Sequence, residues 1–196
     1  MVAATTEPVL TEKRILETAT ALFYERGYRA TTMRDIAAGV GIKAGSLYNH
    51  YAAKQDILLR ICLKTSRALY EGACNAIEGI EDVGELLRAF IVWHVSFHGE
   101  HRHASRVTDL ELRSLDAAAR ATVVEIRDKH ENLLRTILAR GLAEGRWRSQ
   151  NIRIISIGIA TMCTEVDAWY RDDGPLTPQQ IGEIYADFIG NGLRVP

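Results

Sequence analysis

The sequence lacks long apolar runs, and this absence excludes a membrane-spanning protein. The longest apolar stretches, such as Ile152–Ala160, are interrupted by Arg153 and fall far short of the roughly 20 residues that a spanning helix needs. Residues 1–10 contain no basic start followed by an apolar core, so no secretion signal is predicted. We therefore expect a cytoplasmic protein with no membrane partner.

Cysteine is also scarce, which argues against a disulfide framework. The chain has three cysteines, Cys62, Cys74 and Cys163, which are far apart and lie in apolar helical patterns. An odd number of widely separated thiols is typical of reduced core residues. The sequence also has no glycine-rich phosphate loop, serine-centred elbow or close set of cysteine and histidine. We therefore predict neither an enzyme nor a bound cofactor.

The net charge of −1 gives no reason to expect a nucleic-acid partner, but the distribution of charge does. Five cations lie between residues 26 and 54, namely Arg26, Arg29, Arg34, Lys43 and Lys54. Asp35 is the one acidic residue in the same segment. The segment is therefore locally basic within a chain that is otherwise acidic.

Helical periodicity occurs along the whole chain, and no run alternates as a strand would. The sequence therefore predicts an all-α fold of about nine helices. Beyond three short N-terminal helices, the predicted helices cover Ala53–Ile77, Val83–His98, His103–Asp116, Ala118–Glu144, Ile152–Arg171 and Thr177–Leu193.

The N-terminal helices have the pattern of a helix-turn-helix. Thr32 and Asp35 form a capping box that opens the second helix, which we expect to end at Ala38 or Gly39. Residues 39–41 supply a tight turn, and a third helix begins near Lys43. Such a helix fits the major groove of DNA while its neighbour holds it in place.

Residues 23–37 and 45–54 resemble the helix-turn-helix of the TetR family of repressors. The resemblance implies an N-terminal DNA-binding domain over residues 1–52. It also implies that Leu47 belongs to the core of that domain. The implied DNA-contacting residues are Thr31, Thr32, Arg34, Lys43, Ala44, Gly45, Ser46, Tyr48, Asn49, His50 and Lys54. Other members of the family often carry a hydroxyl residue at the position of Lys43 and a basic residue at the position of Ala44. The resemblance therefore does not indicate which DNA sequence this protein recognises.

The same resemblance implies that residues 53–196 form a ligand-binding and dimerisation domain. Its last two helices would form a homodimer, and two heads roughly 34 Å apart would bind a pseudo-palindromic double-stranded DNA operator. A small-molecule effector would release the DNA. The residues expected to line its cavity are Phe90, Trp93, His94, Phe97, Leu110, Leu134, Met162, Glu165 and Trp169.

Residues 169–180 show a weaker similarity to actinobacterial members that respond to acyl-CoA thioesters. This similarity implies control of lipid catabolism. Arg102, Arg106 and Arg113 are candidates for binding the CoA phosphates. Glu165 and Asp167 argue against such a ligand, because carboxylates repel a polyanion.

Four histidines, His94, His98, His101 and His103, lie within ten residues. An i, i+4 pair on one helix face can chelate a transition metal, and Asp109 or Glu165 could complete the shell. We expect Gly99 to end the helix and to leave the later histidines in a solvated loop, so no metal ligand is assigned. A metal-sensing or other small-molecule-sensing regulator of this fold stays open, as does an interaction module that no longer binds DNA.

Overall fold

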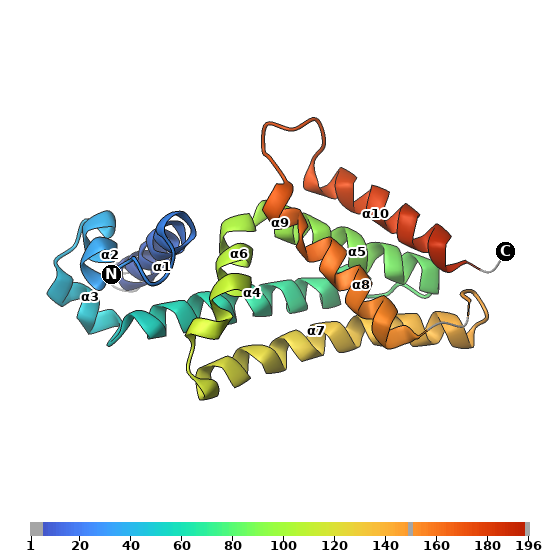
Figure 1. Cartoon of the computed structure of the whole chain (residues 1–196), viewed down its shortest axis with the longest axis horizontal. Coiled ribbons are helices and arrows are strands. Elements are labelled where there is room, and N and C mark those ends of the chain that lie inside the picture. Colours follow the sequence, from blue (N-terminus) through green and yellow to red (C-terminus); the bar gives the residue numbers. More distant parts are fainter. Residues whose placement is uncertain (1–5, 149–150, 195–196) are drawn as a thin grey trace. The chain divides into compact units, whose positions relative to one another are not determined.

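The computed structural model describes residues 6–148 and 151–194, and all its regular elements are helical (Figure 1). They are α1 (Thr6–Arg26), α2 (Met33–Val40), α3 (Ala44–His50), α4 (Lys54–Ile77), α5 (Val83–Glu100), α6 (Arg102–Glu111), the 3₁₀ turn η1 (Leu112–Ser114), α7 (Ala117–Ala143), α8 (Ile152–Thr164), α9 (Val166–Trp169) and α10 (Pro178–Leu193). The predicted all-α fold is confirmed, and the single-turn α9 follows directly on α8. None of the helices in this part of the chain has the length and apolarity needed to cross a bilayer. Residues 1–5, which belong to the segment searched for a secretion signal, lie outside the described residues.

The chain forms two compact units. Unit 1 consists of residues 1–65 and 103–123, and unit 2 of residues 66–102 and 124–196. Unit 1 therefore contains more than the predicted N-terminal domain of residues 1–52. The reason is its core, in which Val107, Leu115 and Val123 are buried together with α1 to α4. The functional division at residue 52 stays a prediction.

In unit 1, α2 begins with the predicted capping box. The Thr32 hydroxyl accepts a hydrogen bond from the Asp35 N–H, and the Asp35 carboxylate accepts one from the Thr32 N–H. The helix ends at Val40 and is capped by Gly41, which has a φ of 78° and donates its N–H to the carbonyls of the last turn. Gly39 lies inside the helix, where a Cβ would stand 2.7 Å from Thr18 Cγ2 of α1. The predicted end at residue 38 or 39 was therefore early, because Gly39 permits close packing instead of ending the helix.

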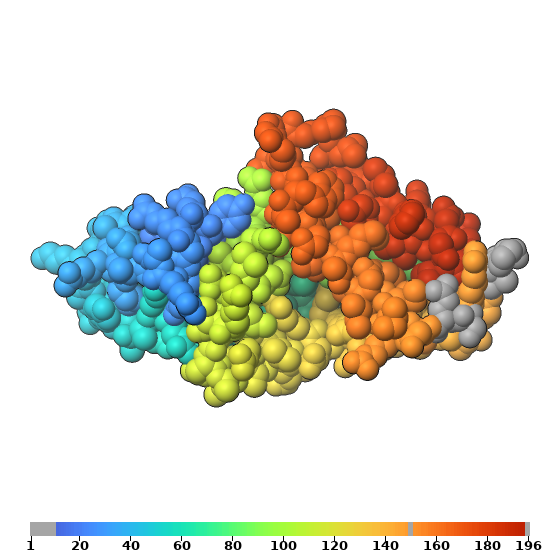
Figure 2. Space-filling view, viewed as in Figure 1, coloured from blue at the N-terminus to red at the C-terminus, as the bar shows by residue number. Residues whose placement is uncertain are grey.

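In unit 2, α10 lies along α5, and both pack against α8 (Figure 1). A Cβ on Gly182 of α10 would lie 2.9 Å from the backbone Cα of Val92, so the two helices approach each other closely. The core between these helices and α7 contains the fully buried Phe90, Ile91 and Leu134. Figure 2 shows α8 and α10 on the surface of this unit.

Helix α5 continues through Gly99 and ends at Glu100, which corrects the prediction of a break. A Cβ on Gly99 would stand 2.6 Å from the Cβ of Pro178, so this glycine allows the start of α10 to pack against α5. His101 is the C-cap, and α6 begins at the next residue. His98 lies on the helix, as predicted, whereas His103 lies on α6 and not in the expected loop.

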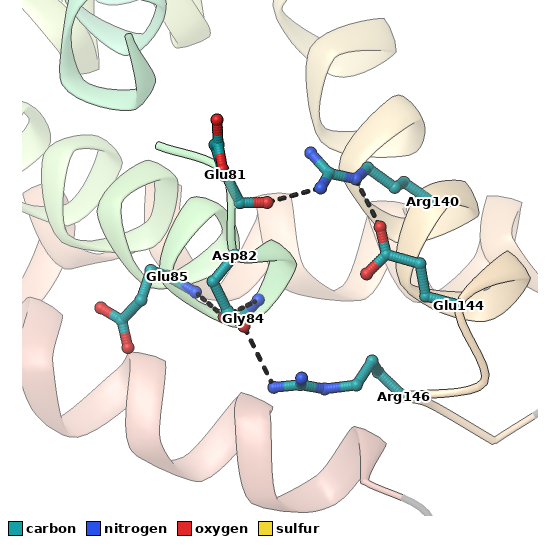
Figure 3. A network of polar contacts seen from close by, with 7 residues as sticks. All are labelled: Glu81, Asp82, Gly84, Glu85, Arg140, Glu144 and Arg146. Carbon is teal, nitrogen blue, oxygen red and sulfur yellow. Dashed lines mark hydrogen bonds and ion pairs between the residues drawn. The ribbon is translucent and has the colours of Figure 1, made fainter. Parts of the chain in front are cut away.

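A polar network fastens the start of α5 to the end of α7 (Figure 3). The Asp82 carboxylate caps α5 by accepting hydrogen bonds from two backbone N–H groups of its first turn. Arg146 lies 3.4 Å from the same carboxylate, while Arg140 donates to the Glu81 carbonyl and to Glu144. These exposed contacts position helix ends, and each is worth little in stability.

Candidate DNA-binding interface and effector region

Helix α3 is held in place by contacts from α1 and α4. Arg14 of α1 donates a hydrogen bond of 2.7 Å to the Val40 carbonyl at the end of α2. The Tyr51 hydroxyl, directly after α3, donates to the Glu12 carboxylate, which also pairs with Arg60 at 3.1 Å. Burial and the neighbouring Glu12 charge raise the pKa of Tyr51 to about 12. Sequence reasoning missed these positioning residues, because partners 26 to 48 positions apart leave no local spacing signal.

One residue of α3 is fully buried, and most of the others are exposed to solvent. Leu47 is fully buried in the core of unit 1, as predicted, whereas Tyr48 is 53% exposed. Six of the predicted contact residues are exposed in this region: Lys43, Gly45, Ser46, Tyr48, Asn49 and His50. Ala44 is half-buried and packs against the core. A short helix with one buried anchor and a polar outer face is suited to enter a groove.

Thr31 is the clearest error among the predicted DNA contacts. Its side chain is completely buried, and its hydroxyl donates to the carbonyls of Gly27 and Leu22 at 3.0 and 3.3 Å. It therefore cannot offer its hydroxyl to a phosphate. Its hydroxyl instead satisfies buried carbonyls where the chain leaves α1.

Thr32 and Arg34 are exposed at the start of α2, but the Thr32 hydroxyl is already engaged. It donates to the Asp35 carboxylate at 2.6 Å, and this bond, together with the backbone bond, lowers the pKa of Asp35. The hydroxyl would have to turn away from Asp35 before it could donate to a phosphate.

Lys54 has a different role from the predicted backbone clamp. Its ammonium donates to the carbonyls of Tyr28 and Thr31 at 2.6 and 2.5 Å and lies 4.3 Å from the centre of the Tyr28 ring. Burial lowers the pKa of Lys54. An ammonium has three donors, so at most one remains for DNA. Lys54 chiefly fastens the connection between α1 and α2.

The order of these helices and the exposed face of α3 agree with the sequence comparisons. Residues 15–61 match the family described as bacterial regulatory proteins of the tetR family. Residues 81–193 match the tetracyclin repressor-like C-terminal domain. The chain belongs to the TetR family.

Full-length relatives share this architecture. The HTH-type transcriptional repressor KstR2 of Mycobacterium tuberculosis is 35% identical over 186 residues, which are 91% of this chain and 90% of that protein. The structure of KstR2, a ketosteroid transcriptional regulator, has a TM-score of 0.88 at 27% identity and covers 94% of this chain and 95% of that one. The fatty acid metabolism regulator protein of Bacillus subtilis is 27% identical over 92% of this chain and 94% of its own length. The structure of AibR in complex with isovaleryl coenzyme A and operator DNA is similar in fold, with a TM-score of 0.80 at 24% identity. The match covers 95% of this chain and 99% of that one.

This TetR-family protein is a helix-turn-helix transcriptional repressor.

Unit 2 of this TetR-family repressor brings together six of the nine predicted effector residues. Phe90, His94, Phe97 and Leu134 are buried, and Trp93 and Met162 pack against the same core. The other three are exposed, which corrects their assignment to a buried cavity. They are Leu110 on α6 of unit 1, at 48%, Trp169, at 50%, and Glu165. Helix α6 buries the face that carries Val107, and α8 breaks at Glu165.

Inside unit 2, His94 lies between two polar side chains, Thr164 and His130, and contacts both. Its Nε2 lies 3.1 Å from the Thr164 hydroxyl, and its Nδ1 lies 3.1 Å from Nε2 of His130 on α7. Burial and the neighbouring histidines hold the pKa of His94 well below its usual value, and burial lowers the pKa of His130 to about 4. His94 and His98 are 2% and 4% exposed, whereas the later histidines, His101 and His103, are exposed. His130 was missed because it stands alone in the sequence.

The predicted cation set for CoA phosphates is not assembled within either unit. Arg102 belongs to unit 2, where it donates to the Tyr170 carbonyl and pairs with Asp172 at 2.9 Å. Arg106 and Arg113 belong to unit 1. Arg102, one of the candidate cations, therefore fastens the segment that follows α9.

Proposed function

We propose that this repressor binds a pseudo-palindromic operator in the cytoplasm as a homodimer and is released by a small-molecule effector. The observation that supports DNA recognition is the presentation of α3, which buries Leu47 and exposes Ser46, Tyr48, Asn49 and His50. A single short helix contacts too few base pairs to be selective. Two DNA-binding domains separated by one turn of DNA, roughly 34 Å, would double the number of base pairs contacted.

The DNA-binding proposal is tested with operator DNA from upstream of the protein's own gene. Tyr48→Ala removes an exposed hydroxyl and ring that we expect to contact phosphate, so the affinity should fall about 10- to 100-fold. Tyr24→Ala is the matched control, because Tyr24 is an exposed tyrosine of α1 outside the predicted contact set. Fluorescence anisotropy over a series of salt concentrations gives both affinity and the number of phosphate contacts. Equal affinities for the two variants would contradict the assignment of Tyr48.

The homodimer is proposed to form through α8 and α10. These helices expose four large apolar side chains: Ile154 at 62%, Ile157 at 44%, Ile184 at 53% and Phe188 at 70%. Apolar groups repeated on neighbouring helices of one unit are typical of a protein interface. Burying the same patch on two copies would give the self-complementary contact that two-fold symmetry requires.

Substitution of Phe188 tests this interface. Phe188→Asp should shift the protein to a monomer in sedimentation velocity at micromolar concentration, because it places an unpaired charge in the apolar contact. Val124→Asp is the control, since Val124 is 37% exposed on α7 and lies outside the proposed interface. A dimer that survives Phe188→Asp with unchanged affinity would place the interface elsewhere.

The proposed effector is an acyl-CoA thioester from lipid breakdown. Two findings support this class: the apolar side chains around Phe90 and Leu134, and the similarity to the ketosteroid regulator KstR2 and to the fatty acid metabolism regulator of B. subtilis. The expected similarity of residues 169–180 to acyl-CoA-responsive members points the same way. AibR shows that a protein of this fold can hold a CoA thioester.

A panel of acyl-CoA thioesters, the matching free acids and free CoA tests this class. The expected result is operator affinity weakened about 5- to 150-fold by at least one thioester, and unchanged by free CoA or free acid. Release by the free acids, or by no member of the panel, would refute a CoA thioester as effector. Neither outcome would bear on the Tyr48 test of DNA binding.

A further inference from the structure

His98 and Asp167 form a polar pair inside unit 2 that the effector proposal does not use. His98 lies on α5 and Asp167 on α9, and they are 4% and 3% exposed. Within the described part of the chain, neither ring nitrogen of His98 has a hydrogen-bond partner. A buried imidazole without a hydrogen-bond partner destabilises the fold, so it needs an explanation.

The gap between the two side chains fits a bridging ion. Nδ1 of His98 lies 3.8 Å from Oδ2 of Asp167, which is too long for a hydrogen bond. A direct hydrogen bond between the two side chains would bring these atoms to within about 3.2 Å of each other. Two ligand atoms bound to one Zn²⁺ at roughly 2.0–2.2 Å each lie about 3–4 Å apart, because the bond angle at the ion is wide.

His94 is placed to orient His98 and not to share its ligand. The two rings are stacked, with centroids 4.8 Å apart and planes inclined by 20°. Both nitrogens of His94 are already engaged, one by Thr164 and the other by His130. The i, i+4 pair of histidines therefore does not chelate an ion in the way that its spacing suggests. The two rings are stacked instead, with both nitrogens of His94 in polar contacts and both nitrogens of His98 without a hydrogen-bond partner.

We propose that His98 and Asp167 bind a divalent transition-metal ion of the Zn²⁺ type. An imidazole nitrogen and a carboxylate oxygen are ligands that suit such an ion, and the engaged His94 ring restricts the rotation of His98. The ion would join α5 to α9, where the chain turns after the break at Glu165. The remaining coordination positions would take water or other oxygen ligands. This inference does not depend on the proposed effector.

The test uses the full-length protein with its affinity tag removed and its metal stripped by EDTA. Zn²⁺ binding is measured by calorimetry, and Co²⁺ is added separately because its visible absorption reports the coordinating ligands. We expect one ion per protomer, and a loss of affinity of more than about tenfold in His98→Ala and in Asp167→Asn. His103→Ala is the matched control, because His103 is an exposed histidine of α6; it should bind as tightly as the wild type.

Three results would overturn the proposal. The first is a natively folded wild type, shown by circular dichroism, that takes up neither ion. The second is unchanged affinity in His98→Ala or, if that variant does not fold, in the nearly isosteric Asp167→Asn. The third is an equal loss in His103→Ala, which would place the ion at surface histidines.

Discussion

The close approach of α10 to α5 predicts opposite effects for the same substitution at two glycines of α10. A Cβ on Gly182 would lie 2.9 Å from the Cα of Val92 and 3.1 Å from its carbonyl oxygen. Both atoms belong to the backbone of a long helix, so neither can move alone. A Cβ on Gly190 has no heavy atom within 4 Å. Gly190 is therefore a control in the same helix.

Alanine at an open helical position should stabilise the fold by up to about 1 kcal/mol, because glycine is the poorer helix former. At Gly182 the added methyl group forces the helices apart, and overpacking of this kind costs about 1–3 kcal/mol. For a chain of this size, 1 kcal/mol corresponds to roughly 2–4 °C in melting temperature. We therefore expect Gly190→Ala to raise the melting temperature, by at most about 4 °C, and Gly182→Ala to lower it by about 2–12 °C.

Thermal unfolding followed by circular dichroism, at one protomer concentration for all variants, measures this difference. A fixed concentration is needed because dimerisation also contributes to stability. If both variants raised the melting temperature equally, the helices would not be in contact at Gly182. The packing of α10 on α5 would then be refuted.

Three further predictions follow from local contacts. Thr32→Ala should lower the free energy of unfolding of unit 1 by about 1 kcal/mol in urea titrations, because α2 loses its N-cap. Tyr51→Phe should cost about 0.5–1.5 kcal/mol in the same assay, because the hydrogen bond to Glu12 is lost. Burial raises the pKa of Cys163 to about 12, so at pH 8 iodoacetamide should modify the half-buried Cys74 in the native protein and Cys163 only after unfolding, as read by mass spectrometry. Native alkylation of Cys163 would contradict its burial.

Features encoded over a few neighbouring residues were predicted well. The Thr32–Asp35 capping box was found because its parts are three residues apart, and the buried anchor Leu47 was found from its motif. The errors share a different cause. Gly99 was expected to end α5, and Thr31 was expected to face DNA. For Gly99 the deciding neighbour, Pro178, is distant in sequence. For Thr31 it is the fold of the chain after α1, which buries the hydroxyl against the carbonyls of Gly27 and Leu22.

The sequence by itself determined the all-α fold, the positions of most helices and membership of the TetR family. Periodicity, caps and ordered motifs act over one or two helical turns, so they can be read along the chain. Only the tertiary structure decided which polar groups are buried. His94, His98, His130 and Asp167 come from three helices and meet inside unit 2. Their environment depends on packing between distant segments, and no spacing rule carries that information.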